Sequence, residues 1–152
     1  MATSLTWHCH GFDGFSIHTL YAALALRDRV FVVEQDSIYG DIDGVDPDCL
    51  HLCAYDGQGR LAAYARLIAP GDKYEGASAI GRVVLEPALR GTGLGKTLLA
   101  EAVRQCESHW PDSPVMLSAQ ADKLGFYQTF GFKAVSEPYD DGGILHVTMR
   151  RD

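Results

Sequence analysis

Apolar and polar positions follow two different periods along this chain, and the helical period appears first. Over residues 19–31 the apolar side chains recur at helical spacing, which predicts an amphipathic helix that Ser16 or Thr19 can cap. From Leu94 onward a second apolar stripe runs opposite a charged face, and this helix should stop before Pro111. Two of the predicted helices are therefore long enough to cover a sheet.

Shorter apolar runs, bounded by glycine, proline and aspartate, indicate strands. These predicted strands cover residues 51–55, 61–67, 79–85, 115–119, 132–135 and 144–149. The turn residues 56–59 predict a hairpin between the first two strands, and residues 140–143 predict another before the last strand. A short helix over 123–130 should end at Gly131 in the left-handed conformation.

The order of these elements predicts a single domain spanning residues 1–152. It gives an α/β (α+β) chain with a mixed central sheet and helices on both faces. Only the strand–helix–strand unit at the centre requires a parallel pair of strands. Such a crossover opens a crevice at the carboxyl ends of its strands, near Leu85 and Ala119, where a ligand is expected.

Charge and composition narrow the classes of partner. The 152 residues carry a formal net charge of −7 without clustered Lys and Arg, which argues against a nucleic-acid partner. No apolar run approaches the length that spans a membrane, and the first residues lack the pattern of a secretory signal. We therefore expect a cytoplasmic protein, with no membrane partner.

Acidic residues gather in segments 34–36 and 41–48. One interpretation is a solvated loop, and another is a funnel that attracts a cationic amine. The sequence leaves both open.

Four cysteines without an export signal fit reduced thiols better than disulfides. Cys49, His51 and Cys53 alternate on a predicted strand and could point to one face. No second cluster completes a tetrahedral site, so no metal is predicted.

The glycine-rich segment Arg90-Gly-Thr-Gly-Leu-Gly-Lys-Thr97 lies between a predicted strand and a predicted helix. Backbone N–H groups and a helix dipole make an anion site there, which points to a phosphate-bearing ligand. The mononucleotide loop would need glycine where Arg90 stands. The dinucleotide fingerprint fails in both frames, because Lys96 or Leu98 occupies the place of its third glycine.

The remaining pattern, Arg90-Gly-Thr-Gly-Leu-Gly95, resembles the R/Q-x-x-G-x-G/A loop of the GCN5-related N-acetyltransferase (GNAT) superfamily. Leu85-Glu-Pro87 resembles the end of its preceding strand, and residues 126–132 resemble its x-Y-x-x-x-G-F helix end. Segments spread over most of the chain are similar to the ElaA-like branch: residues 31–35, 41–44, 63–66, 81–83, 119–121 and 126–128.

The resemblance implies the GNAT fold, in which acetyl-CoA is wedged where two central parallel strands splay apart. Backbone amides of the glycine loop would hold the pyrophosphate, and strand backbone would pair with the pantetheine arm. The residues implied in acetyl-CoA binding are Val83, Val84, Leu85, Arg90, Gly91, Thr92, Gly93, Leu94, Gly95, Lys96, Gln120 and Tyr127. Gln120 is a departure, because many members have Asn at this position.

Acyl transfer to an amine needs one group that accepts a proton and one that donates a proton to the departing thiolate. Tyr127 is the candidate donor; the alternative is an aromatic ring packed beside Phe126 and Phe130. The identity of the proton acceptor is open, because residues 79–85 contain no Asp or Glu. A water chain could serve, with contributions from flanking residues, of which the candidates are Glu34, Asp43, His51 and His146.

The expected function is an N-acetyltransferase that moves the acetyl group of acetyl-CoA to a primary amine of a small molecule, peptide or protein by direct attack on the thioester. One alternative is a non-catalytic CoA-binding or regulatory module, and another is a nucleotide-binding protein. The expected partners are acetyl-CoA and a cationic, amine-bearing acceptor. The identity of the acceptor stays open, as does the choice between a monomer and a homodimer.

Overall fold

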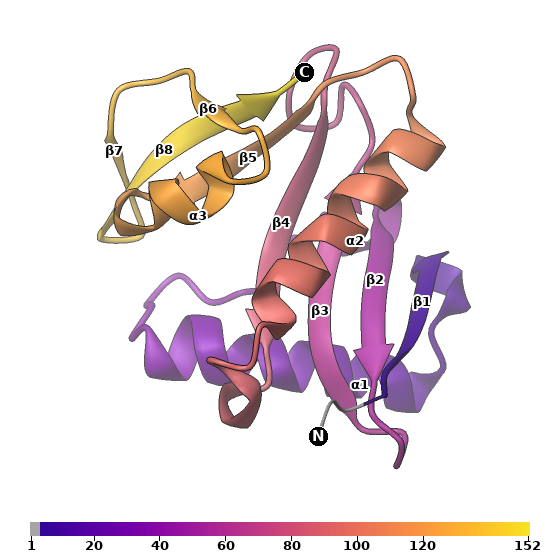
Figure 1. The fold of residues 1–152 in the computed structure, drawn as a ribbon. Coiled ribbons are helices and arrows are strands. Elements are labelled where there is room, and N and C mark those ends of the chain that lie inside the picture. The colour runs from indigo at the N-terminus through magenta and orange to yellow at the C-terminus, as the bar shows by residue number, and fades with distance from the viewer. Residues whose placement is uncertain (1–3) are drawn as a thin grey trace.

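One mixed sheet organises the chain, as Figure 1 shows for the computed structural model, which describes residues 4–152. Seven of the eight strands of this part run in the order β1-β2-β3-β4-β5-β8-β6, and the eighth, β7, pairs with the start of β8. Their bounds are β1 (Thr6–Gly11), β2 (Leu50–Tyr55), β3 (Leu61–Ile68), β4 (Ser78–Leu85), β5 (Val115–Gln120), β6 (Lys133–Ala134), β7 (Tyr139–Asp141) and β8 (Ile144–Arg151). The predicted mixed sheet is confirmed.

Helices cover both faces of this sheet. In Figure 1, α2 (Leu94–His109) and α3 (Leu124–Gln128) lie in front of the strands and α1 (Ile17–Arg27) lies behind them. Helix α2 buries its apolar stripe against β3, β4 and β5, while α1 buries Ala23 and Leu26 against β3 and β4. The predicted placement of helices is therefore confirmed.

Helix α1 starts earlier and continues further than predicted. Ser16 caps it reciprocally, because its Oγ accepts from the Thr19 N–H at 3.0 Å while the Thr19 Oγ1 accepts from the Ser16 N–H at 2.9 Å. The chain then continues without a break into a π-helical segment, Asp28–Glu34. The helix therefore carries Glu34 past Phe31, the residue at which the apolar pattern ends.

Strand β1 was not predicted. It is an edge strand that buries only part of its surface, and two histidines interrupt its apolar pattern. Trp7 and Cys9 pack against the core of the sheet, whereas Thr6 and His8 are exposed. Because this edge strand is covered on one side only, its alternation of apolar and polar residues is short. Such a short pattern does not distinguish a strand from a loop.

The two central parallel strands separate after a short contact. The pairing of β4 with β5 consists of Ser78 opposite Val115 and Ala79 opposite Met116. Beyond these pairs the strands diverge, as Figure 1 shows, and the carboxyl ends at Leu85 and Gln120 lie apart. This confirms the splayed parallel pair that the resemblance implies.

A bulge in β4 accompanies this divergence. The register between β3 and β4 shifts between Tyr64 and Arg66, and Arg82 has a φ of 52° in the bulged stretch. A positive φ in a residue with a Cβ costs about 1–2 kcal/mol, so the surrounding contacts must hold Arg82 in place. The bulge turns β4 away from β5.

The C-terminal part matches its predicted pattern, with a shorter α3 and β6 and with a β8 that extends two residues beyond the predicted 144–149. Gly131 has a φ of 87°, as predicted for the end of α3. Strand β6 is shorter than the predicted 132–135, and the β7–β8 hairpin turns at Gly142 and Gly143, where a turn is predicted. Both hairpins expected from the turn residues are present.

Candidate active site

The glycine loop joins the end of β4 to the start of α2. Gly93 has a φ of 87° and immediately precedes the helix, and the first backbone bond of the helix runs from the Thr97 N–H to the Gly93 carbonyl. The N–H groups of Leu94, Gly95 and Lys96 come before that bond, so the helix itself supplies no acceptor for them. Three donors and the positive end of a 16-residue helix therefore face the same point.

Two of the predicted site residues lie together at this loop. The Arg90 Nη1 is 2.7 Å from the Glu34 Oε1, and both side chains are about half exposed. The π-helical segment thus brings Glu34 from the α1 side to the beginning of the glycine loop. This contact makes Glu34 a neighbour of the anion site.

The end of β4 offers backbone to a ligand along one edge. Val84 and Leu85 pair with Tyr64 and Ala63 of β3, so β3 occupies the other edge. Because β5 has already diverged, the edge of residues 83–85 that faces it is not covered by strand pairing. An extended pantetheine arm could add there as a further strand.

Tyr127 lies on α3, on the same face of the sheet as α2. Its ring packs edge to face against Phe126 and Phe132, with centroids 5.2 and 6.3 Å away. Burial raises the pKa of the Tyr127 hydroxyl, which is therefore protonated at neutral pH. Both interpretations of Tyr127, as packing residue and as proton donor, fit this environment.

His51, the second residue of β2, is buried in a polar network. Its Nε2 lies 2.9 Å from the Asp46 carbonyl oxygen, which can only accept, so Nε2 carries the proton. The Nδ1 then accepts from the Tyr64 hydroxyl at 2.6 Å. Burial lowers the pKa of His51, in keeping with a neutral ring. Both ring nitrogens are thus engaged inside the protein.

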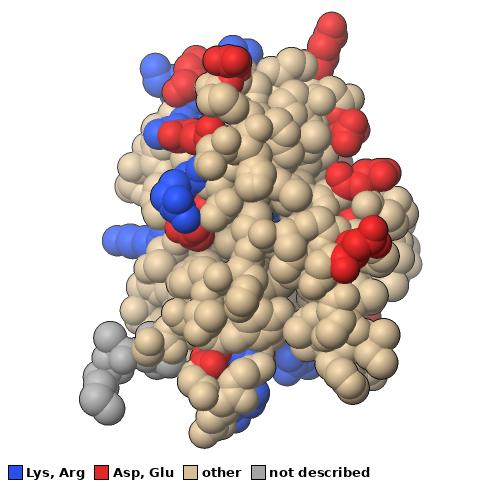
Figure 2. Space-filling model, turned by 90° about the vertical axis from the view of Figure 1, so that its right-hand side faces the viewer, with Lys and Arg blue, Asp and Glu red and all other residues tan. Residues whose placement is uncertain are grey.

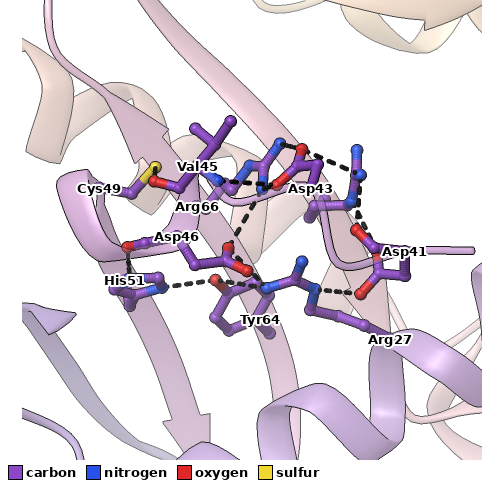
Figure 3. Close-up of polar contacts among 10 residues, drawn as sticks. Arg27, Asp41, Asp43, Val45, Asp46, Cys49, His51, Tyr64 and Arg66 are labelled. Carbon is purple, nitrogen blue, oxygen red and sulfur yellow. Dashed lines mark hydrogen bonds and ion pairs between the residues drawn. The ribbon is translucent and has the colours of Figure 1, made fainter.

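The acidic segment 41–48 is exposed over much of its length, but three of its four aspartates are paired inside the protein, which the sequence did not predict. Figure 3 shows its carboxylates paired with Arg27 of α1 and Arg66 of β3, and Arg82 of β4 is a third arginine partner. The ion pairs are Arg27 with Asp41 and Asp46, Arg66 with Asp43 and Asp46, and Arg82 with Asp41 and Asp43. Three arginines therefore offset three aspartates, and little of this negative charge is left for an acceptor.

The pKa values in this network agree with the pairing. A hydrogen bond from Arg66 is the main cause that lowers the pKa of Asp43. Burial alone would raise the pKa of Asp46, but hydrogen bonds and charges from Arg27 and Arg66 lower it overall. Sequence reasoning missed these contacts because the paired residues lie 14 to 41 positions apart.

Cys49 immediately precedes β2, and Cys53 lies within it. Within residues 4–152, no three His, Cys, Asp or Glu side chains are grouped to hold a metal ion. The Cys49 thiol donates to the Val45 carbonyl at 3.3 Å, and burial raises the pKa of Cys49 to about 11 and that of Cys53 to about 12. Both thiols are therefore protonated at neutral pH, and all four cysteines of the chain are free.

Surface charge is sparse on the face of the molecule shown in Figure 2. Most of that face is uncharged, acidic side chains line one edge, and the basic side chains at the upper left lie among acidic ones. Among the described helices, none combines the length and the apolar character needed to cross a membrane.

Known proteins share this arrangement of loop, helix and diverging strands. Residues 21–152 match the family described as the acetyltransferase (GNAT) domain. The chain belongs to the GNAT family. Protein ElaA of Escherichia coli K12 is 43% identical to it over 150 residues, which are 97% of each chain.

Two solved structures superpose on nearly the whole chain. The crystal structure of Escherichia coli ElaA has a TM-score of 0.90 at 42% identity and covers 98% of this chain and 100% of the other. An acyl-CoA N-acyltransferase from Pseudomonas aeruginosa has a TM-score of 0.93 at 45% identity, with coverage of 98% and 100%. The predicted GNAT membership, ElaA-like branch and fold are confirmed.

Proposed function

We propose that this chain is an N-acetyltransferase that moves the acetyl group of acetyl-CoA to a primary amine of a small molecule, peptide or protein. The observation that carries this proposal is the start of α2. There the N–H groups of Leu94, Gly95 and Lys96 converge beside the open edge of β4. An elongated ligand with a pyrophosphate at one end and amide groups along its arm matches both features.

The binding roles follow from these two features. Amides of residues 91–96 hold the pyrophosphate, with Arg90 beside it, and the backbone of Val83, Val84 and Leu85 pairs with the pantetheine arm. Gln120, at the end of the opposite strand, can donate or accept a hydrogen bond on the other side of the arm. The thioester then lies between the diverging strands.

The reaction is a direct attack of the amine on the thioester carbonyl, which acetyl-CoA supplies in activated form. A strand amide near the β4 bulge stabilises the developing oxyanion. Tyr127, which is protonated at neutral pH, donates a proton to the departing sulfur. Glu34 acts through Arg90 rather than on the amine, and the hydrogen bonds of His51 leave it a structural role.

The amine that receives the acetyl group is less defined than the acetyl donor. The paired aspartates 41, 43 and 46 no longer argue for a cationic acceptor, so the proposal is limited to a primary amine. The four free cysteines favour a reducing compartment, and we place the reaction in the cytosol.

A thiol-release assay with acetyl-CoA and a panel of amines and lysine peptides tests the proposal. It is run beside thermal-shift titrations with acetyl-CoA and with ATP. A ligand at about 100 times its Kd should add roughly 2.7 kcal/mol to the free energy of unfolding. Turnover with an amine supports the proposal. Stabilisation by acetyl-CoA without turnover supports the binding module instead, and equal stabilisation by ATP supports a nucleotide-binding protein.

A further inference from the structure

His146 lies at the open end of the splayed strands. It is on β8, directly opposite Gln120, the last residue of β5. Residues that face each other in an antiparallel pair project to the same face of the sheet. The neighbouring Val147 and Ala119 are buried against the α2 side, so His146 and Gln120 project to the opposite face. His146 and Tyr127 therefore flank the diverging strands from opposite faces.

The backbone sets which nitrogen of His146 carries the proton. Its Nδ1 is 2.8 Å from the Ile144 carbonyl oxygen, which can only accept, so Nδ1 is the protonated nitrogen of the neutral ring. The lone pair is then on Nε2, which makes no hydrogen bond within residues 4–152. This is the reverse of His51, where both nitrogens are used.

The surroundings hold the ring in this orientation. The ring of Tyr139, on β7, stacks against His146 at 25° with a centroid distance of 6.4 Å. The Tyr139 hydroxyl is itself fixed by the hydroxyls of Ser118 at 2.5 Å and Thr148 at 3.0 Å. Of the charged groups on the hairpin, Asp141 shares the strand face of Tyr139, while the Asp140 Oδ1 accepts from the Gly143 N–H.

The other candidates for a proton acceptor are already engaged. Asp43 pairs with Arg66, Glu34 pairs with Arg90, and His51 bonds to Tyr64 and Asp46. His146 is the histidine that combines an available lone pair with a place beside Gln120. Histidine is also the side chain whose ordinary pKa suits proton acceptance near neutral pH.

We propose that His146 is the proton acceptor of the reaction, with Nε2 taking a proton from the ammonium group of the acceptor. This inference rests on the proposed acetyltransferase function. Loss of that proton leaves a neutral amine, whose lone pair forms the C–N bond as the C–S bond breaks. Tyr127 gives its proton to the sulfur and regains one from the new amide nitrogen, and His146 releases its proton to water.

The test is the pH dependence of kcat/KM for an acceptor whose own pKa is above about 9. The wild-type value should rise while the catalytic base loses its proton and then level off well below the pKa of the amine. In His146→Gln the value at pH 7 should fall about 100-fold and keep rising about tenfold per pH unit, because only free amine reacts. His18→Gln, at an exposed position on α1, is the control and should follow the wild type.

Two further measurements separate the possible outcomes. The Kd of acetyl-CoA should be unchanged in His146→Gln, and imidazole should restore turnover to His146→Ala. Wild-type turnover with an unchanged profile in His146→Gln overturns the role of His146 alone. Absence of turnover with any amine in the wild type overturns the proposed function and this inference with it. If His146→Gln does not fold, the wild-type chain alone still tests the role of His146. A wild-type kcat/KM that keeps rising up to the pKa of the amine, without levelling off, overturns that role.

Discussion

The Arg82 Nε donates to the Asp41 Oδ1 across 2.6 Å, joining the β4 bulge to the acidic segment. Arg82 is also the residue whose φ of 52° is strained, so this contact helps to hold the bulge. Asp41 in turn accepts from Arg27 on α1 at 2.8 Å. The acidic segment therefore connects α1 to the strand whose divergence opens the site.

Asp46→Asn should strongly destabilise the protein, because it leaves Arg27 and Arg66 buried with one less anionic partner. Removal of one partner from a buried ion pair costs about 3–5 kcal/mol. Urea unfolding followed by circular dichroism measures the loss. The control is Asp152→Asn, which removes a solvent-exposed pair with Arg150 and should leave the midpoint unchanged. Equal midpoints for the two variants would show that the network is not a source of stability.

Stability should also fall in acid. The pKa values of Asp43 and Asp46 are lower in the folded chain than in the unfolded chain, so the unfolded state binds more protons as the pH falls. The contribution of these groups is fully present well above the unfolded value of about 3.9 and is lost as the pH falls below it. Urea midpoints from pH 7 to pH 3 should drop steeply below about pH 4, and less steeply in Asp46→Asn. A midpoint independent of pH over this range would contradict the pairing.

Local chemistry explains what could be predicted from sequence. The helix at residues 94–109 and the glycine loop before it follow from spacing over a few neighbouring positions, and the structure has them with nearly the predicted bounds. The cap at Ser16 is likewise a contact over three residues. Such features depend on backbone rules that act within one turn.

The rest depends on contacts between distant segments. Arg27 and Asp46 are neighbours because α1 packs behind the sheet, and no local pattern of either segment indicates the other. The same holds for His51, whose place beside Tyr64 comes from the register of β2 with β3. A lone histidine on a strand looks alike in sequence whether both ring nitrogens are engaged, as in His51, or one has no partner within the described residues, as in His146.

Gly93→Ala should weaken acetyl-CoA binding and lower the free energy of unfolding. Its φ of 87° places an added Cβ in the unfavourable left-handed region at a cost of about 1 kcal/mol, although within residues 4–152 nothing beyond its neighbours along the chain lies within 4 Å of that Cβ. Gly59→Ala is the matched control, because Gly59 has a φ of 77° and equally open space in the β2–β3 turn. Both variants should lose similar stability in urea, but only Gly93→Ala should raise the Kd of acetyl-CoA. A raised Kd in both variants would mean that general destabilisation, not the loop, is responsible.

Glu34→Gln should tighten acetyl-CoA binding by a few fold. In the wild type the Glu34 carboxylate holds Arg90 at 2.7 Å and places negative charge beside the expected pyrophosphate site. Loss of that charge frees Arg90 for the ligand, and the gain is modest because the pair is half exposed. Isothermal titration of acetyl-CoA at low and high salt measures it, and the difference should shrink at high salt. Glu107→Gln, which removes a pair with Arg151 at the far end of α2, should leave the Kd unchanged.

Tyr127→Phe should lower kcat about 100-fold and leave the Kd of acetyl-CoA nearly unchanged. The substitution removes the hydroxyl and keeps the ring contacts with Phe126 and Phe132, so packing is preserved. Tyr21→Phe, on the exposed side of α1, should have wild-type kcat. A second acetyl donor serves as a test: an acetyl thioester whose thiol has a pKa of about 5. Its thiolate leaves without being protonated, so with this donor Tyr127→Phe should approach the wild-type rate. If acetyl-CoA turnover is unchanged in Tyr127→Phe, the ring serves packing alone and the sulfur leaves without help from this hydroxyl.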